Sequence, residues 1–162
     1  CASFAAFGTK HKCASVYLPP VPSERSTAIS QIESSGSLDG CTIVGGDFNC
    51  VPECALDTLR HSDAPYSNAY SLEWEALMSE HGLHDQLRKQ RGRVKGPFTC
   101  LRAGAGSATR IDRIYIKNSA GLQWDMGIED TFGLSPNRTH TDHRAVSACC
   151  TQVGIEERGK DV

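Results

Sequence analysis

The chain has 162 residues, of which 39% are hydrophobic and 22% are charged, and its net charge at pH 7 is −2. This length most simply makes one domain, and the apolar fraction can build a real core, which excludes a largely disordered chain. No apolar run approaches the length that spans a bilayer, and the apolar start is too short, and lacks the basic residues, for a signal peptide. Because the first residue is Cys1 rather than Met, we expect a piece of a longer product.

The pattern of apolar and turn-forming residues predicts alternating strands and helices. In chain order the expected elements are a strand at 14–18, a helix at 23–34, a strand at 41–44, a loop at 50–70, a helix at 71–81, a strand at 98–101, a small-residue turn at 103–108, strands at 110–116 and 145–150, and a polar tail at 151–162. Ser23 is the expected cap of the first helix, and Trp74, Leu77 and Met78 share one face of the second. The pattern indicates one α/β or α+β domain over residues 1–150.

One acidic side chain is expected on an apolar face of the strand at 110–116. Because side chains alternate along a strand, Asp112 shares a face with Ile114 and Ile116 and lies opposite Arg113. A carboxylate in such a place is costly unless it is paired. Its partner is therefore expected to be a nearby arginine, a histidine or a metal ion.

The sequence offers a histidine partner just before the last strand, in the stretch Thr-Asp-His-Arg. Here Asp142 stands beside His143. A carboxylate that pairs with imidazole fixes its tautomer and raises its basicity. His143 is therefore a candidate partner for Asp112.

A further pair of polar side chains follows the buried strand at 41–44. Asp47 and Asn49 come after Gly45 and Gly46, which let the backbone bend and leave room for a ligand. Open α/β sheets place their sites at the carboxyl ends of strands. This position predicts that Asp47 and Asn49 belong to a site.

If these acidic residues converge in one site, their negative charges must be balanced by a positive charge. If Asp47, Asp112 and Asp142 meet near His143, the carboxylates repel one another unless a cation or the imidazole offsets them. Oxygen ligands favour Mg²⁺ or Mn²⁺ over zinc. A divalent ion, a carboxylate that orients water and a cationic histidine are the groups needed for attack on a phosphodiester.

The eight cysteines are interpreted as free thiols rather than as a disulfide framework. Several lie in apolar, strand-like runs, where a thiol acts as a small hydrophobe. A zinc site built from Cys50, Cys54, His140 and His143 is disfavoured, because the spacings fit no standard pattern. The cysteines favour a reducing, intracellular setting, nuclear or cytoplasmic.

A basic stretch is hidden by the small net charge. Residues 88–117 carry nine basic side chains and one acidic side chain, whereas acids are in excess before and after them. Taken alone, such a run is as well explained by a solvated loop as by a surface for the phosphate backbone. The residues expected to contact nucleic acid here are Arg88, Lys89, Arg91, Arg93 and Lys95.

Three motifs, in this order, resemble the endonuclease/exonuclease/phosphatase superfamily: Gly-Gly-Asp-Phe-Asn at 45–49, Arg-Ile-Asp-Arg-Ile at 110–114 and Thr-Asp-His-Arg at 141–144. Val-Tyr-Leu-Pro at 16–19 is similar to the Tyr-containing strand of that family. The stretch at 82–116 looks most like the endonuclease domains of LINE-type retrotransposons. The resemblance implies a four-layer sandwich of two packed mixed sheets with helices outside.

The resemblance also implies a role for each matching residue. Asp47 would orient the attacking water and share in the metal site with Asp142, and Asn49 would contact the reacting phosphate. His143 would stabilise that phosphate while Asp112 holds the imidazole. Tyr17 would contact the phosphate, and Thr99 would lie at the DNA-binding edge.

One part of the family pattern has no counterpart here. The family takes an Asn and a Glu from a strand that precedes the Tyr-containing strand, and no Glu precedes Tyr17. Losing that part would expose an apolar sheet face and an unpaired strand edge.

The leading hypothesis is therefore a fragment of a Mg²⁺- or Mn²⁺-dependent DNA-nicking endonuclease of a retrotransposon, of weak or no activity, which works beside other domains such as a reverse transcriptase. The alternatives are the same fold acting on RNA or a small phosphoester, as deadenylases and phosphatases do, and a non-catalytic remnant that binds nucleic acid.

Overall fold

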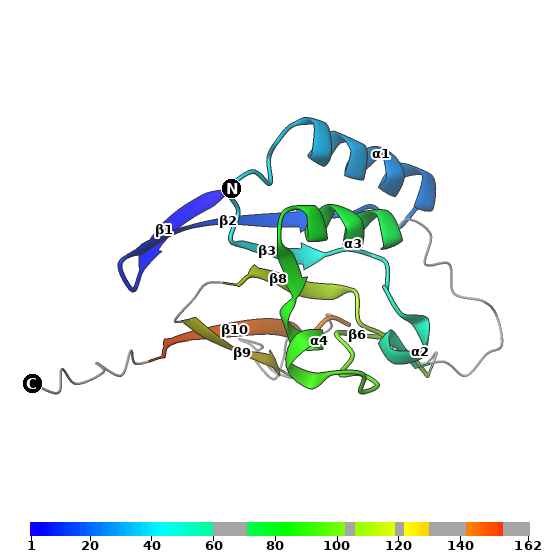
Figure 1. Ribbon diagram of the computed structural model, residues 1–162. Coiled ribbons are helices and arrows are strands. Elements are labelled where there is room, and N and C mark those ends of the chain that lie inside the picture. Colours follow the sequence, from blue (N-terminus) through cyan, green and yellow to red (C-terminus); the bar gives the residue numbers. More distant parts are fainter. Residues whose placement is uncertain (60–70, 103–105, 119–121, 130–141, 154–162) are drawn as a thin grey trace, which may run out of the picture.

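The computed structural model describes residues 1–59, 71–102, 106–118, 122–129 and 142–153 (Figure 1). The helices and strands of these ranges are β1 (Ala2–Ala6), β2 (Thr9–Tyr17), α1 (Pro22–Ser34), β3 (Ile43–Asp47), α2 (Cys54–Asp57), β4 (Thr58–Leu59), α3 (Ser71–Glu80), β5 (Leu83–Asp85), α4 (Gln86–Arg91), β6 (Cys100–Arg102), β7 (Ser107–Thr109), β8 (Asp112–Lys117), β9 (Leu122–Glu129) and β10 (Ala145–Gln152).

A five-stranded mixed sheet forms the centre of the molecule, with the strand order β1-β2-β3-β8-β5. β2 and β3 run parallel, and the other neighbours in this sheet run antiparallel. α1 and α3 cover one face of the sheet, and the two-stranded sheet of β9 and β10 lies on the other side (Figure 1). A small sheet, β4-β7-β6, stands at one end. The predicted fold class, mixed α and β with packed sheets and outer helices, is confirmed.

The side chains of β8 alternate between two of the hydrophobic clusters of the core. Tyr115 packs with Val44 and with Trp74 of α3 on the helix side. Ile114 and Ile116 pack on the opposite side, against apolar side chains of β9 and β10. Asp112 lies two and four residues before these isoleucines and therefore projects from the same face of β8. Its carboxylate lies on the side of the sheet that faces β10, as the sequence predicts.

Several predicted boundaries move. β3 begins at Ile43 and continues through the two glycines to Asp47, so the strand predicted at 41–44 starts too early and stops too soon. The helix predicted from Ser23 begins at Pro22, and the residue at its N-cap, Val21, makes no side-chain cap. The predicted loop at 50–70 contains α2 and β4.

Other predictions fall partly outside the described residues. Residues 60–70 of the predicted loop and 103–105 of the predicted turn lie outside them, and β7 begins at Ser107. β10 extends to Gln152, into the predicted polar tail, whose residues 154–162 lie outside them as well. β1, β5, α4 and β9 have no counterpart among the predicted elements.

A buried ion-pair network fixes the segment that leads into β8. The Arg110 guanidinium donates from Nε to Asp57 and from Nη1 to Asp85, both at 2.7 Å. Arg88 pairs with the same Asp57. Burial raises the pKa of Asp57, but the hydrogen bond and charge of Arg110, together with the charge of Arg88 and the backbone amide of Glu53, bring it below its usual value.

The eight cysteines are free thiols. Within the described ranges, no helix combines the length and apolar character that crossing a bilayer requires.

Candidate active site

A row of the predicted site residues crosses three adjacent strands of the central sheet. Tyr17 at the end of β2 lies opposite Asp47 at the end of β3, and Asp47 lies opposite Asp112 at the start of β8. Residues directly opposite in a sheet project from the same face. Two of the sequence motifs therefore meet through strand pairing alone, with the exposed ring of Tyr17 at the edge of the row.

His143 completes this row from a distant part of the chain. Its Nδ1 lies 2.9 Å and 3.1 Å from the two carboxylate oxygens of Asp112. An ionised carboxylate only accepts hydrogen bonds, so Nδ1 carries the proton and donates it to Asp112. Of the partners that the sequence left open for Asp112, the structure places the histidine there. The other imidazole nitrogen, Nε2, lies 3.9 Å from Asp142 Oδ1.

Asp47 and Asn49 form a compact turn immediately after β3. The backbone amide of Asn49 donates to Asp47 Oδ1 at 2.9 Å, and Asn49 has a left-handed φ of 48°. Its side-chain amide donates to the carbonyl of Leu18 at 2.9 Å, which ties the end of β3 to the residue after β2. The turn thus orients the Asp47 carboxylate, and a contact between Asn49 and a phosphate stays a prediction.

The electrostatics of Asp47 reflect its crowded position. Burial raises its pKa; the amide of Asn49 opposes this rise, the charge of Asp112 adds to it and His143 opposes it. Two carboxylates directly opposite one another are destabilising by repulsion. The site therefore gains from any cation that binds between them.

Thr99 acts on this site from below the surface. Its side chain is buried, and its hydroxyl accepts the backbone amides of Ile111 at 3.1 Å and Asp112 at 3.0 Å. The expectation that Thr99 lies near a DNA-binding edge stays a prediction. The side chain fixes the first residue of β8 beneath its carboxylate.

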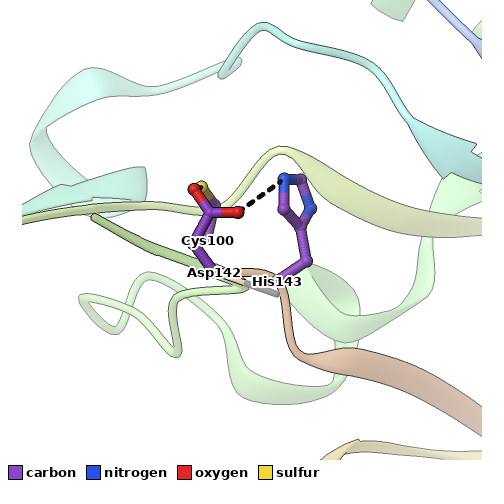
Figure 2. Close-up of side chains that lie close together, drawn as sticks. All are labelled: Cys100, Asp142 and His143. Atoms are coloured by element: carbon purple, nitrogen blue, oxygen red, sulfur yellow. Dashed lines mark hydrogen bonds and ion pairs between the residues drawn. The ribbon is translucent and has the colours of Figure 1, made fainter. Parts of the chain in front are cut away.

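The segment carrying Asp142 and His143 is held against β6 by backbone hydrogen bonds. Leu101 N donates to the Asp142 carbonyl at 2.7 Å, and Arg144 N donates to the Thr99 carbonyl at 2.6 Å. These bonds form a bridge between Cys100 and His143. As a result the Asp142 carboxylate lies between the Cys100 thiol and the His143 imidazole (Figure 2).

Two groups of side chains within the described residues could hold a metal ion, and they share His143. One group is Asp47, Asp112 and His143, and the other is Cys100, Asp142 and His143. The predicted pairing of Asp142 with Asp47 is not found within either group. The first group suits Mg²⁺, which prefers oxygen ligands, keeps several waters and is often held by one or two carboxylates.

Sequence reasoning missed Cys100 as a member of the site. Its only local signal was an apolar strand, and the residues that it meets come more than forty positions later. Of the disfavoured zinc set, His140 lies outside the described residues, and Cys50 is buried with its sulfur 3.7 Å from the Arg113 guanidinium.

Some basic side chains of this stretch form ion pairs with acidic residues of the protein, and some are exposed to solvent; Arg93 does both. The Arg88 guanidinium is bound to Asp57 inside the protein, and Arg93 pairs with Glu53 near the surface. The loop after α4 runs into Thr99 and so ends beside His143. The exposed basic side chains within residues 88–95 are Lys89, Arg91, Arg93 and Lys95, and Lys117 at the end of β8 is exposed as well.

A cavity of about 520 Å³ continues the site between the central sheet and β10. Asp47 and Asp112 stand in its wall. The other lining residues are mainly small or apolar: Cys13, Ala14, Ser15, Ile43, Gly45, Gly46, Ile114, Ala145 and Val146, with Arg113 and Arg144.

The sequence matches no protein-family model and no curated protein. Several solved structures are similar to this chain, among them the following two. One is a 3′-5′ exonuclease, NExo, from Neisseria meningitidis, with a TM-score of 0.59, 20% identity and coverage of 90% of this chain. The other is the 3′ phosphatase NExo from Neisseria bound to product DNA hairpin, with a TM-score of 0.63, 19% identity and coverage of 90% of this chain. The chain has the endonuclease/exonuclease/phosphatase-like fold.

This chain spans 62% of the length of each of those two structures. At 19% and 20% identity this similarity establishes the fold but not the reaction that the chain catalyses. The site residues described above rest on the geometry of this chain.

Proposed function

We propose that this chain is a metal-dependent phosphodiester hydrolase that acts on nucleic acid. The observation that carries the proposal is the hydrogen bond from His143 Nδ1 to Asp112, with Asp47 directly opposite Asp112 in the sheet. A carboxylate-supported imidazole next to a second carboxylate provides both an oriented donor for a phosphate and an acceptor for water. The fold, which is that of solved nucleic-acid phosphoesterases, supports the same reaction class.

Each side chain has a role that its geometry suits. Asp47 orients a water and accepts its proton as the water oxygen bonds to phosphorus. His143, protonated on both nitrogens, donates from Nε2 to a non-bridging oxygen, and Asp112 stabilises the imidazolium through Nδ1. The bond from phosphorus to the leaving oxygen breaks, and that oxygen takes a proton from solvent. Tyr17, exposed at the end of the row, donates to the phosphate.

The metal belongs between the paired carboxylates. Asp47 and Asp112 would hold Mg²⁺ or Mn²⁺ with water completing the coordination, and Asp142 lies close enough to His143 to serve as an outer partner. When bound, the ion offsets the charge that builds on the phosphate oxygens. The raised pKa of Asp47 fits a site whose carboxylates need a cation.

The substrate proposed is DNA. The exposed basic side chains within residues 88–95 lie on α4 and on the loop that ends beside His143, where a phosphate backbone could run from the site along the protein. The motif resemblance narrows the proposal to a nicking endonuclease of a LINE-type retrotransposon, carried with domains such as a reverse transcriptase.

A plasmid-nicking assay tests the proposal. Supercoiled DNA in Mg²⁺ should become relaxed, and chelator or His143→Ala should remove the activity by about 10²-fold or more, because the donor to the phosphate is lost. His84→Ala is the matched control, since His84 is exposed on β5 and lies outside both metal groups.

Each other outcome contradicts the proposal in a defined way. Retention of DNA without cleavage in Mg²⁺ or Mn²⁺ supports a nucleic-acid-binding remnant. Release of phosphate from a small phosphoester, or cleavage of RNA but not DNA, supports the alternative substrates. Nicking that survives His143→Ala places the chemistry elsewhere.

A further inference from the structure

The cluster of Cys100, Asp142 and His143 combines a thiol, a carboxylate and an imidazole at the edge of the site (Figure 2). Two strand segments bring these groups together. Cys100 and His143 are bridge partners in an antiparallel pair, so their side chains leave the same face. The flanking backbone hydrogen bonds, at 2.7 Å and 2.6 Å, hold the register without the help of the side chains.

The three groups of the cluster lie close enough together to surround one small ion, with their ligand atoms all within 4.8 Å of one another. Cys100 Sγ lies 3.6 Å from Asp142 Oδ2, and His143 Nε2 lies 3.9 Å from Asp142 Oδ1. Around a tetrahedral Zn²⁺, standard bond lengths set the sulfur–oxygen separation at about 3.5 Å and the nitrogen–oxygen separation at about 3.3 Å. A movement of about half an ångström by the exposed Asp142 side chain would bring its separations from the sulfur and from the imidazole to these values.

The second partner of the imidazole also favours a metal. Asp112 accepts from Nδ1, which leaves the lone pair of the neutral ring on Nε2, the nitrogen that faces Asp142. A carboxylate behind a histidine in this way orients a metal ligand and raises its basicity. A soft thiolate with an imidazole selects zinc-like ions over magnesium.

We propose that Cys100, Asp142 and His143 form a site for a thiophilic divalent ion of the Zn²⁺ class, separate from the carboxylate pair that suits Mg²⁺. The thiol gives up its proton to solvent as the ion binds, so that thiolate and carboxylate together neutralise the ion. Water takes the fourth position. Cys100 is 3% exposed, and the Asp142 side chain, which is 51% exposed, gives the ion its path from solvent.

Occupation of this site has a consequence that rests on the proposed function. The ion takes His143 Nε2, the nitrogen that would donate to the phosphate, so a bound Zn²⁺ withdraws the imidazole from catalysis. Zinc should then inhibit the hydrolase while Mg²⁺ supports it. The two metal groups oppose each other because they share one histidine.

A cobalt titration tests the binding without any catalytic step. Co²⁺ substitutes for Zn²⁺, and a Co²⁺–thiolate bond gives a charge-transfer absorption in the near ultraviolet. The whole chain, reduced with a phosphine, should show this band at one ion per chain, and Zn²⁺ should bleach it. Cys100→Ser should abolish the band, and Asp142→Asn should weaken Co²⁺ binding about tenfold or more.

The matched control is Cys54→Ser, because Cys54 packs in the same small apolar cluster as Cys100 but lies outside the ligand group. It should keep the band. Absence of the band in the unaltered chain, or its survival in Cys100→Ser, overturns the site. If Cys100→Ser fails to fold by circular dichroism, Asp142→Asn decides, since its side chain is exposed. Cobalt binding without nicking contradicts only the proposed function, and nicking without a cobalt band contradicts only this site.

Discussion

The pairing of Asp47 with Asp112 is the most demanding contact in the site. Each carboxylate repels the other, and each is partly withdrawn from water. Asp112 has His143 as compensation, whereas Asp47 has a backbone amide and a raised pKa. The pair therefore costs stability in the absence of a cation and provides a binding site in its presence.

This cost gives a prediction for Asp47→Asn. The folded-state pKa of Asp47 is raised, so its stabilising contribution is full below the ordinary carboxyl pKa of about 3.9 and is lost as pH rises through the raised value. Near neutral pH the amide should therefore raise the melting temperature, and the gain should shrink in acid. Nicking should fall by about 10²-fold or more, because the water loses its base.

Thermal denaturation at neutral and acid pH, without metal, measures the effect. Glu80→Gln, which removes an exposed carboxylate, serves as the control. Equal melting temperatures for Asp47→Asn and the unaltered chain at neutral pH would show that Asp47 carries no such cost.

At this scale the sequence predicts the central contact well and its surroundings poorly. The parity of Asp112 in an apolar strand was enough to demand a partner, and His143 is that partner. Thr99 and Cys100 were not foreseen in their roles, because a buried hydroxyl that accepts two backbone amides leaves no pattern in the sequence.

Among the elements, β3 carries the most specific constraint. It reaches Asp47 through two glycines rather than ending before them. Gly46 has a φ of 156°, and a Cβ there would lie 1.8 Å from the Val16 carbonyl oxygen. Gly45 has room, since its nearest contact would be 3.5 Å from Ile114 Cγ1. The close approach of β2 and β3 that aligns Tyr17 with Asp47 thus depends on Gly46 alone of the two.

Gly46→Ala and Gly45→Ala should consequently differ. The first must push β2 from β3 and should destabilise the fold by about 1–3 kcal/mol or more, with loss of activity. The second should change the free energy of unfolding by about 0.5 kcal/mol or less. Urea denaturation of both variants measures this difference. Equal costs would show that the β2–β3 contact is not as tight as described.

The elements that were not predicted differ in how clearly the sequence signals them. In β9 the apolar residues Leu122, Trp124, Met126 and Ile128 alternate with three polar residues and Gly127, a pattern that predicts a strand. The hairpin of β1 and β2 turns at Phe7-Gly8, both with positive φ, in place of the usual Asn-Gly. An aromatic residue at that position gives no turn signal, so the hairpin was hidden.

At the scale of the whole molecule, the fold brings segments that are distant in the sequence together at one end of the central strands. β2, β3 and β8 align Tyr17, Asp47 and Asp112, and β6 holds the segment that delivers His143. Motif order indicated this convergence, but only the three-dimensional fold shows how it is built. The same assembly leaves a cavity between the central sheet and β10, beside the carboxylates.

The central claim is that Asp112 holds His143 through Nδ1, thirty-one residues away in the sequence. Long-range ¹H–¹⁵N correlation of the imidazoles tests it directly, with the His143 signals assigned by their loss in His143→Gln. In the neutral ring we predict a protonated Nδ1 and an unprotonated Nε2, with a marked shift of both in Asp112→Asn. A proton on Nε2, or signals that Asp112→Asn leaves unmoved, would contradict the account.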